Sequence, residues 1–578
     1  EAVPATPSMK DINRSKISSF LDKAHAFFLR YLADSSRAIE INAAPDEDKQ
    51  PAALQIPESE NQWKLVWREF RRRRLAVGAY YVIVVLLTIS IFAPFLANDR
   101  PLVYRGVNYR QYREASRNIS AVIGGQIRAV TAGGKSEFQD PARIVTQQIE
   151  LMGTQLTAEK VVQLQQLEDR IIQLVESPEN NPQVTADLRA ARREFRRNFD
   201  LRKVELVTAT HWPVLTVLNW IGVMLLCANT IFLLRPAWNW LLGRLLSNAT
   251  RHTQRLTQFA ILVGIPLLSG LAWMTLVTHR VDVTPYKQAA FQTGKTVSSD
   301  TAVVYDWAIW PLVPYGLDEI DLDAKYVKPG SSSTGDIQRQ ATGSLQPWQQ
   351  PHWLGTDGIG RDITSRMIWG GRVSMAVGIV AVSIYVTIGI IIGSLAGYFR
   401  GIADLFISRI IEVVICFPSF FLILTIVAFV GPSIFNIMLV IGLTAWTGVA
   451  RLVRGEFLRL GQQEFVLAGR ALGYSPPRII FRHVLPNALA PVLVSATFGI
   501  AGAILTESAL SFLGFGVTVP WPSWGSILSS GRDAISRAPW LIYFPGIAIF
   551  LTITAYNLVG EALRDASDPR LRGQHTSH

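Results

Sequence analysis

Eight apolar stretches of about 20 residues, each with few or no charges, constrain this sequence more than any other feature. As a helix, a stretch of that length crosses a hydrocarbon layer of roughly 30 Å. The chain has 49% hydrophobic and only 17% charged residues, a balance that is unusual for soluble domains. We therefore predict an all-α membrane protein with eight membrane helices, near residues 76–96, 213–234, 258–278, 371–397, 407–430, 434–450, 488–508 and 541–562.

The placement of arginines predicts the orientation of these helices. The net charge is +12, but the arginines flank the apolar stretches instead of forming one soluble patch, so nucleic acid is not an expected partner. Arg71–Arg74 precede the first stretch, and loop 235–257 contains arginines but no acidic residue. Because cytoplasmic loops of membrane proteins are enriched in Lys and Arg, we place the N-terminus, 235–257 and 451–487 in the cytoplasm. Segments 100–212 and 279–370 then lie outside.

These crossings divide the chain into consecutive parts. We expect a loosely ordered cytoplasmic tail at 1–69, a first membrane helix at 70–99, an extracytoplasmic helical segment at 100–212, a membrane helix pair at 213–278, a second extracytoplasmic segment at 279–350, a membrane core at 351–572 with its cytoplasmic loop at 451–487, and a short tail at 573–578. The two outer segments are expected to form one module.

Part of the first outer segment shows a helical repeat. Val161, Leu164, Leu167, Ile171 and Leu174 recur at the spacing of one helix face. A break at 180–182 and a second helical pattern over 186–207 follow, so we predict a helical hairpin. A spacer or packing role is its simplest interpretation.

The cytoplasmic loop between the sixth and seventh apolar stretches predicts a helix, a glycine turn and a second helix. It reads Glu464-Phe-Val-Leu-Ala-Gly-Arg-Ala-Leu-Gly473, and Ile479-Ile-Phe-Arg-His-Val-Leu-Pro486 follows. Gly473 allows a backbone with positive φ at the turn. A short helix presented in this way suits docking into a groove on a partner protein.

At this loop the sequence resembles the peptide and nickel permeases of ABC importers. Ala468, Gly469, Gly473, Leu485 and Pro486 occupy positions of their coupling-loop pattern, whereas Leu467 stands where a glutamate is usual. Glu464 and Arg470 are the nearest charges that can replace it. Further similar strings are His352-Trp-Leu-Gly-Thr-Asp-Gly-Ile-Gly-Arg-Asp362, Ser365–Ser374, Thr506–Gly516, Pro522–Gly525 and Leu563–Arg570, and Trp63–Asp99 resembles the family's N-terminal segment.

The resemblance implies the C-type member of a permease pair with a six-helix core. It implies a second homologous permease subunit, two ABC ATPase subunits that hold ATP and magnesium, and an extracytoplasmic solute-binding protein as partners, in the cytoplasmic membrane of a bacterium and in contact with its lipid. This chain itself is expected to hold no cofactor. The family pattern does not extend over about 100–345, so that region, with two added spans, is expected to be an insertion.

Two groups of polar residues outside the loop are candidates for function. Glu507, with Ser508 and Ser511, lies near the outer end of its apolar stretch. A carboxyl group at that depth is expensive unless it faces a polar cavity or a partner, so it is a translocation-path candidate, or alternatively a carboxylate that caps local backbone. Asp357, Arg361 and Asp362 belong to a glycine-rich outer turn, which they either fix through ion pairs or offer to a binding protein.

No catalytic chemistry is expected of this chain. The strings Gly134-Lys-Ser136 and Gly294-Lys-Thr296 lack the upstream glycine of a phosphate-binding loop, and the eight histidines show no metal-ligand spacing. Two alternatives stay open: an importer for nickel or another small solute, and a membrane receptor or scaffold whose outer module binds a partner.

Overall fold

The computed structural model describes residues 62–132, 137–176, 182–201, 203–245, 251–276, 284–287, 289–291, 302–332 and 348–567. The chain divides into two compact units, Glu1–Leu65 and Val66–His578. Most of the tail predicted for 1–69 lies outside the described residues, but its last part is helical, because α2 covers Gln62–Arg72. The phosphate-loop strings at 134–136 and 294–296 also lie outside the described residues.

Five long helices form the membrane core: α3 (Arg74–Ile91), α14 (Ile363–Phe399), α17 (Ile434–Leu460), α20 (Leu485–Phe512) and α22 (Trp540–Ser567). Within the described part of the chain, six helices can cross a membrane, or up to eight if each of two bent pairs is one span. This agrees with the predicted all-α membrane fold. The stretch predicted at 434–450 was too short, because α17 continues through the amphipathic residues that follow it.

Close packing of α14 against α17 depends on glycines at every fourth position. A Cβ atom added at Gly389, Gly393 or Gly397 would lie 2.6, 2.5 or 2.5 Å from atoms of α17. Small residues at this spacing let the backbones of two membrane helices approach closely. Together with α16 and α20, these helices enclose the largest apolar cluster of the core, which includes Val377, Val449 and Val453.

The stretch predicted as one span at 407–430 is broken. It forms α15 (Gly401–Ile415) and α16 (Ser419–Val430), which are bent by 79° relative to each other. Pro418 lies between them and disfavours a helical backbone at Phe417. The proline was the signal that the sequence prediction overlooked.

The added membrane segment also differs from its prediction. The stretch at 213–234 begins with the 3₁₀ turn η1 (Pro213–Val217), and α9 covers only Trp220–Leu233. The region predicted as loop 235–257 is largely helical, with α10 (Arg235–Leu245) and α11 (Arg251–Phe259). The π-helical segment η2 (Ala260–Gly264) leads from α11 into α12 (Ile265–Leu276), which packs against α9. The Trp273 Nε1–H of α12 donates to the carbonyl of Leu218, just before α9, at 3.0 Å.

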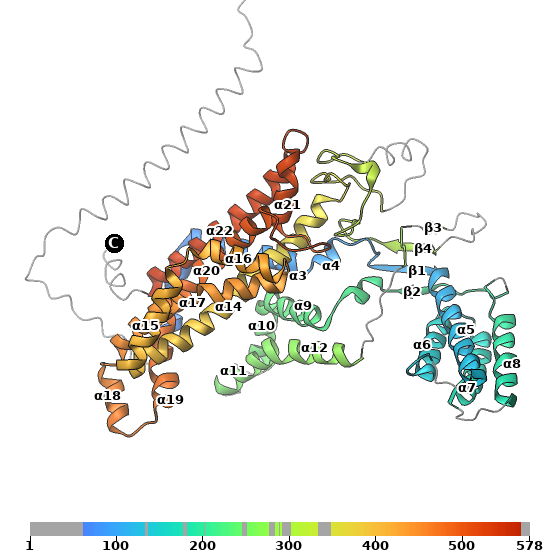
Figure 1. Cartoon of the computed structure of the whole chain (residues 1–578), viewed down its shortest axis with the longest axis horizontal. Coiled ribbons are helices and arrows are strands. Elements are labelled where there is room, and N and C mark those ends of the chain that lie inside the picture. The colour runs from blue at the N-terminus through green and yellow to red at the C-terminus, as the bar shows by residue number, and fades with distance from the viewer. Residues whose placement is uncertain are drawn as a thin grey trace, which may run out of the picture. The chain divides into compact units, whose positions relative to one another are not determined.

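A four-helix bundle occupies most of the first outer segment (Figure 1). It consists of α5 (Tyr109–Ala132), α6 (Pro141–Gly153), α7 (Ala158–Glu176) and α8 (Pro182–Asn198). The predicted hairpin is α7 and α8, but α8 ends before the expected 207. Leu164, Leu167 and Ile171 are buried, as their spacing predicts. Burial raises the pKa of Tyr112, whose hydroxyl donates to the Phe199 carbonyl at 3.0 Å and ties α5 to the end of α8.

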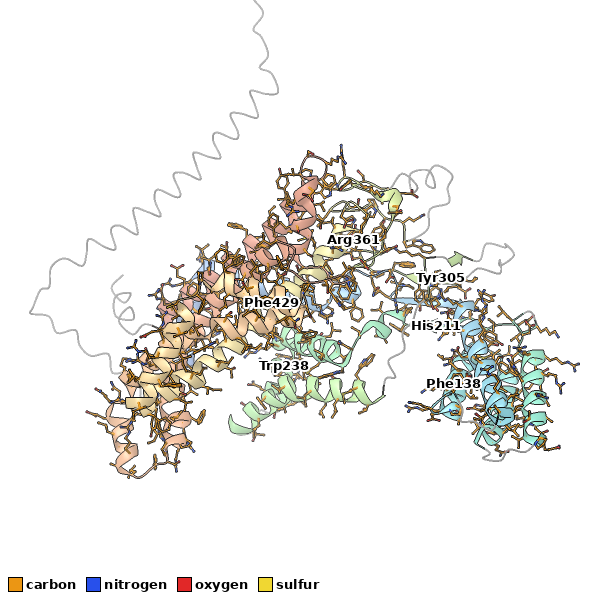
Figure 2. All side chains as sticks on the ribbon, viewed as in Figure 1. Phe138, His211, Trp238, Tyr305, Arg361 and Phe429 are labelled. Atoms are coloured by element: carbon orange, nitrogen blue, oxygen red, sulfur yellow. The ribbon has the colours of Figure 1, made fainter. Side chains whose placement is uncertain are left out.

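A small sheet joins the two outer segments and was not predicted. Its strands are β1 (Val103–Asn108), β2 (Ala209–His211), β3 (Ala289–Phe291) and β4 (Val303–Ile309), in the order β2-β1-β4-β3. β1 and β4 are antiparallel, with Asn108 opposite Val303 and a register shift at Gly106. The aromatic ring of Tyr305, labelled in Figure 2, lies in the core of this sheet, and its hydroxyl donates to the Tyr286 carbonyl at 2.9 Å.

Short elements complete the described structure: α4 (Ala93–Leu96), the 3₁₀ turn η3 (Leu322–Ala324), α18 (Glu464–Ala471), α19 (Pro476–Arg478), the π-helical segment η4 (Ile479–Val484), α21 (Trp524–Gly531) and the 3₁₀ turn η5 (Arg532–Ala534).

Candidate functional site

The loop between α17 and α20 contains a short helix that ends in a hydrogen-bonded glycine turn. Gly473 has φ +72°. Its N–H donates to the Arg470 carbonyl at 3.0 Å, and the Tyr474 N–H donates to the Gly469 carbonyl at 3.1 Å. These two bonds form a Schellman motif, in which a residue with positive φ satisfies the last carbonyls of a helix. The sequence prediction of helix, glycine turn and second helix describes this segment correctly.

One face of this loop is fixed to the rest of the protein. Val466 of α18 and Ile479 and Val484 of η4 are buried in the large apolar cluster. Tyr474 stacks on His483 with ring centroids 5.7 Å apart, and the Arg478 guanidinium lies 4.1 Å from the Tyr474 ring centroid. These contacts hold α18 and the start of α20 together across the turn.

The opposite face of the loop is exposed and largely apolar. Leu467 is 50%, Leu472 70% and Phe481 66% exposed. Leu467, which replaces the glutamate expected at this position, therefore adds apolar surface to this face. Surface of this kind on a short, fixed helix is suited to a groove in a partner protein.

The other predicted residues of the loop have distinct positions. Glu464 is in the first turn of α18, where a negative charge is favourable, and Arg470 is in its last turn, 5.4 Å from the Tyr398 ring centroid. Ala468 is exposed and Gly469 is buried. Leu485 and Pro486 begin α20, which continues directly from the π-helical segment η4 as part of one helix over Pro476–Phe512.

An ion pair beside this loop was missed by the sequence analysis. Arg454 of α17 and Asp404 of α15 form a two-point pair, with Nη2 2.8 Å from Oδ2. Arg400 also donates from Nη2 to the Leu458 carbonyl at 3.3 Å. Both contacts connect the broken span to the helix that leads into the loop. Charged residues at the ends of apolar stretches were the available signal, but their pairing is between segments far apart in sequence.

The three residues of the outer turn stabilise that turn. One carboxylate oxygen of Asp357 accepts from the N–H groups of Ile359 and Arg361, each at 3.0 Å, and the other accepts from Arg361 Nε at 2.8 Å. Asp362 caps α14 by accepting from the Ser365 N–H at 2.7 Å, and its other oxygen lies 2.9 Å from Nδ1 of His352.

The charged groups of this turn have little exposed surface. Both carboxylates are buried, and Arg361, labelled in Figure 2, is 13% exposed at its side chain. Gly360 needs its φ of +80° and its lack of Cβ, because a Cβ atom would lie 1.6 Å from the Asp321 carbonyl oxygen. The geometry supports a structural function of the turn, and its contact with a binding protein stays a prediction.

Glu507 is fully buried where three elements meet. Its carboxylate accepts from the Ser374 hydroxyl of α14 at 3.1 Å and from the Ser511 hydroxyl of α20 at 2.7 Å. Ser374 also accepts from the Trp524 N–H at 3.2 Å, which connects the cluster to α21. Ser508 is buried beside it. The geometry supports a helix-packing function, and the proposed position of Glu507, Ser508 and Ser511 on a translocation path stays a prediction.

Among the described residues, no group of three or more His, Cys, Asp or Glu side chains has an arrangement that could hold a metal ion. The features with definite geometry are a loop with exposed apolar side chains, a hydrogen-bonded outer turn and a buried hydrogen-bonded carboxylate.

Comparison with known proteins gives the family. The profile described as "binding-protein-dependent transport system inner membrane component" matches residues 389–573, and that of the N-terminal TM domain of oligopeptide transport permease C matches 61–124. The second match corrects the predicted limit of the insertion, because the family pattern continues past residue 100 into α5.

Named relatives match about two fifths of this chain. The dipeptide transport permease DppC of Alkalihalophilus pseudofirmus is 41% identical, over 42% of this chain and 80% of the relative. The oligopeptide transport permease OppC of Bacillus subtilis is 39% identical, over 39% and 74%. The glutathione transport permease GsiD of Pectobacterium atrosepticum is 42% identical, over 38% and 73%. With its multiple candidate spans, this chain therefore belongs to the family of multi-pass inner-membrane permeases of binding-protein-dependent ABC transport systems.

Proposed function

We propose that this chain is the C-type permease subunit of an ABC importer that carries peptides. The relatives described above are named for dipeptide, oligopeptide and glutathione transport, all of which have peptide cargo. A solute-binding protein would deliver the peptide on the outer side, and ATP hydrolysis on separate subunits would drive alternating access.

The observation that carries this proposal is the geometry of the loop from Glu464 to Pro486. Its inner face is packed and its turn is hydrogen-bonded, so the loop can transmit a displacement as a unit. Its outer face presents Leu467, Leu472 and Phe481 to a partner. The loop connects α17 to α20. An ATPase that binds its exposed apolar face could therefore move these two membrane helices.

The proposed assembly follows from one such loop per chain. One loop can engage one ATPase, so a second homologous permease is expected to engage the other, and ATP and magnesium belong to the two ATPase subunits. No specific observation favours the alternatives of a nickel or other small-solute importer, or of a receptor or scaffold. A coupling loop with this geometry would be unnecessary in a scaffold.

The test is purification of the native complex through a tag on this chain, with mass spectrometry of its subunits and trapped ligand. We expect a second permease, two ATPases and bound peptide. ATPase activity in proteoliposomes should rise when a peptide-loaded binding protein is added. The variant Leu472→Ser should weaken that stimulation, whereas Val162→Ser, which changes another exposed apolar residue, on α7, should not. Bound nickel, or purification without ATPase subunits, would contradict the proposal.

A further inference from the structure

α10 has the pattern of a helix that lies on a membrane surface. Trp238, Leu241, Leu242 and Leu245 recur at i, i+3, i+4 and i+7 and form one apolar stripe. Arg235, seven residues before Leu242, lies at one edge of this stripe, and Arg244 lies on the other side of the helix. None of its residues is buried, and Leu245 is 70% exposed. With 11 residues, α10 is about 16 Å long, too short to cross a bilayer. Trp238 and Leu242 are half-buried, but Leu241 and Leu245 need a cover that the described residues do not supply.

The bend between α9 and α10 gives α10 the orientation that such a surface position requires. The two helices are bent by 69°. A membrane span tilts by about 20° from the bilayer normal, so a helix bent this far from a span runs close to the membrane plane. The bend is held by a hydrogen bond of 2.8 Å from Trp238 Nε1–H to the Ile231 carbonyl. Trp238 is labelled in Figure 2, between the α9 and α12 helices.

Tryptophans mark the depth at which α10 lies. Trp212 and Trp220 are exposed at the start of the apolar stretch, and Trp240 is exposed after its end. Tryptophan side chains are enriched at both interfaces of a bilayer, where the ring is apolar and the indole N–H reaches polar groups. The α9 segment therefore runs between two interfacial belts, and α10 begins at the second one.

The charge of this region identifies the partner. No acidic residue occurs between Glu205 and Asp282 in the sequence, and arginines 235, 244, 251 and 255 lie in and between α10 and α11. The Arg244 guanidinium lies 5.8 Å from the Trp240 ring centroid, which holds the cation beside an interfacial ring. A basic amphipathic helix with exposed Trp and Leu matches a surface of anionic lipid headgroups.

We propose that α10 lies in the cytoplasmic interface of the membrane and binds anionic phospholipid headgroups through Arg235 and Arg244. The exposed stripe of Leu241 and Leu245 covers the acyl-chain side, and the guanidinium groups contact headgroup phosphates. Lipid recognition therefore belongs to the added helix pair and is independent of the peptide cargo.

The test uses the complete complex in nanodiscs, with Cys227 and Cys416 replaced and a bimane fluorophore on a single Leu241→Cys. Nanodiscs contain the same mole fraction of either brominated phosphatidylglycerol or brominated phosphatidylcholine, whose bromine atoms quench bimane on contact. Leu268→Cys, on the exposed side of α12, is the control within the bilayer, and Val162→Cys on α7 is the control in water.

Brominated phosphatidylglycerol should quench the Leu241 probe more strongly than brominated phosphatidylcholine, because each surface arginine enriches anionic lipid roughly fivefold. The two lipids should quench equally at Leu268. Arg235→Gln with Arg244→Gln should remove the preference and leave quenching by phosphatidylcholine intact. The proposal is overturned by equal quenching at Leu241 in the unsubstituted chain, by a preference that survives the double substitution, or by iodide quenching at Leu241 as strong as at Val162.

Discussion

Replacing Gly473 tests whether the hydrogen-bonded turn after α18 couples ATP hydrolysis to transport. A Cβ atom at this position would meet nothing within 4 Å, so a larger side chain has room. Its cost arises from the backbone, because a φ of +72° is left-handed and costs about 1–2 kcal/mol for most residues. A β-branched residue is worse still. A change of 1–2 kcal/mol alters a local equilibrium by a factor of about 5–30.

In most molecules, Gly473→Val should therefore displace the loop from its Schellman geometry. The amount of peptide transported per ATP hydrolysed should fall by about fivefold or more. Gly473→Asn should retain most coupling, since Asn tolerates left-handed backbone. The assay measures peptide uptake and ATP hydrolysis together in proteoliposomes, with membrane insertion checked by protease protection.

Gly514 provides a matched control at the other end of α20. It has φ +91°, no atom within 4 Å of an added Cβ, and the same pair of turn bonds, from Gly514 to Ser511 and from Phe515 to Leu510. Gly514→Val introduces similar strain away from the loop and should leave the ratio of transport to hydrolysis unchanged. A Gly473→Val complex with normal coupling, or equal uncoupling by both variants, would refute the reasoning.

Three further predictions concern stability and topology. Asp357→Asn should lower the thermal stability of the purified complex by about 1–3 kcal/mol, because the Arg361 ion pair and its hydrogen bond are lost in a buried turn; an unchanged unfolding midpoint would contradict this role. Glu507→Gln should be tolerated, whereas Glu507→Leu leaves two buried serine hydroxyls without their acceptor and should lower the free energy of unfolding by about 1–3 kcal/mol; equal unfolding midpoints for the two variants would indicate another function for the carboxylate. In cells, a membrane-impermeant thiol reagent should label Val162→Cys from outside but not Leu472→Cys, and the reverse result would overturn the predicted topology.

Length and apolarity were enough to predict most membrane helices. Local patterns also predicted the glycine turn at 473 and the buried face of α7, because in both cases the information lies within a few residues. The break at Pro418 and the apolar stripe of α10 are local signals too. A window of apolar residues indicates neither of them, because it measures only length and apolarity.

Other features had no local signal. β1 and β4 are short and pair across almost the whole insertion, so neither strand can be recognised without the other. The Ser374 partner of Glu507 and the Arg454 partner of Asp404 come from distant helices, and a carboxylate in sequence does not reveal whether it will face a serine, an arginine or an open path.

The antiparallel register of β1 and β4 has a consequence for how this chain could be engineered. Asn108 is directly opposite Val303, where Cα atoms of paired strands are about 5 Å apart. The segment 109–302, which contains the bundle and both added spans, therefore begins and ends at neighbouring positions of the sheet. A two-residue hairpin turn could close that gap, so the register is compatible with a chain in which 109–302 is excised or exchanged for a different domain.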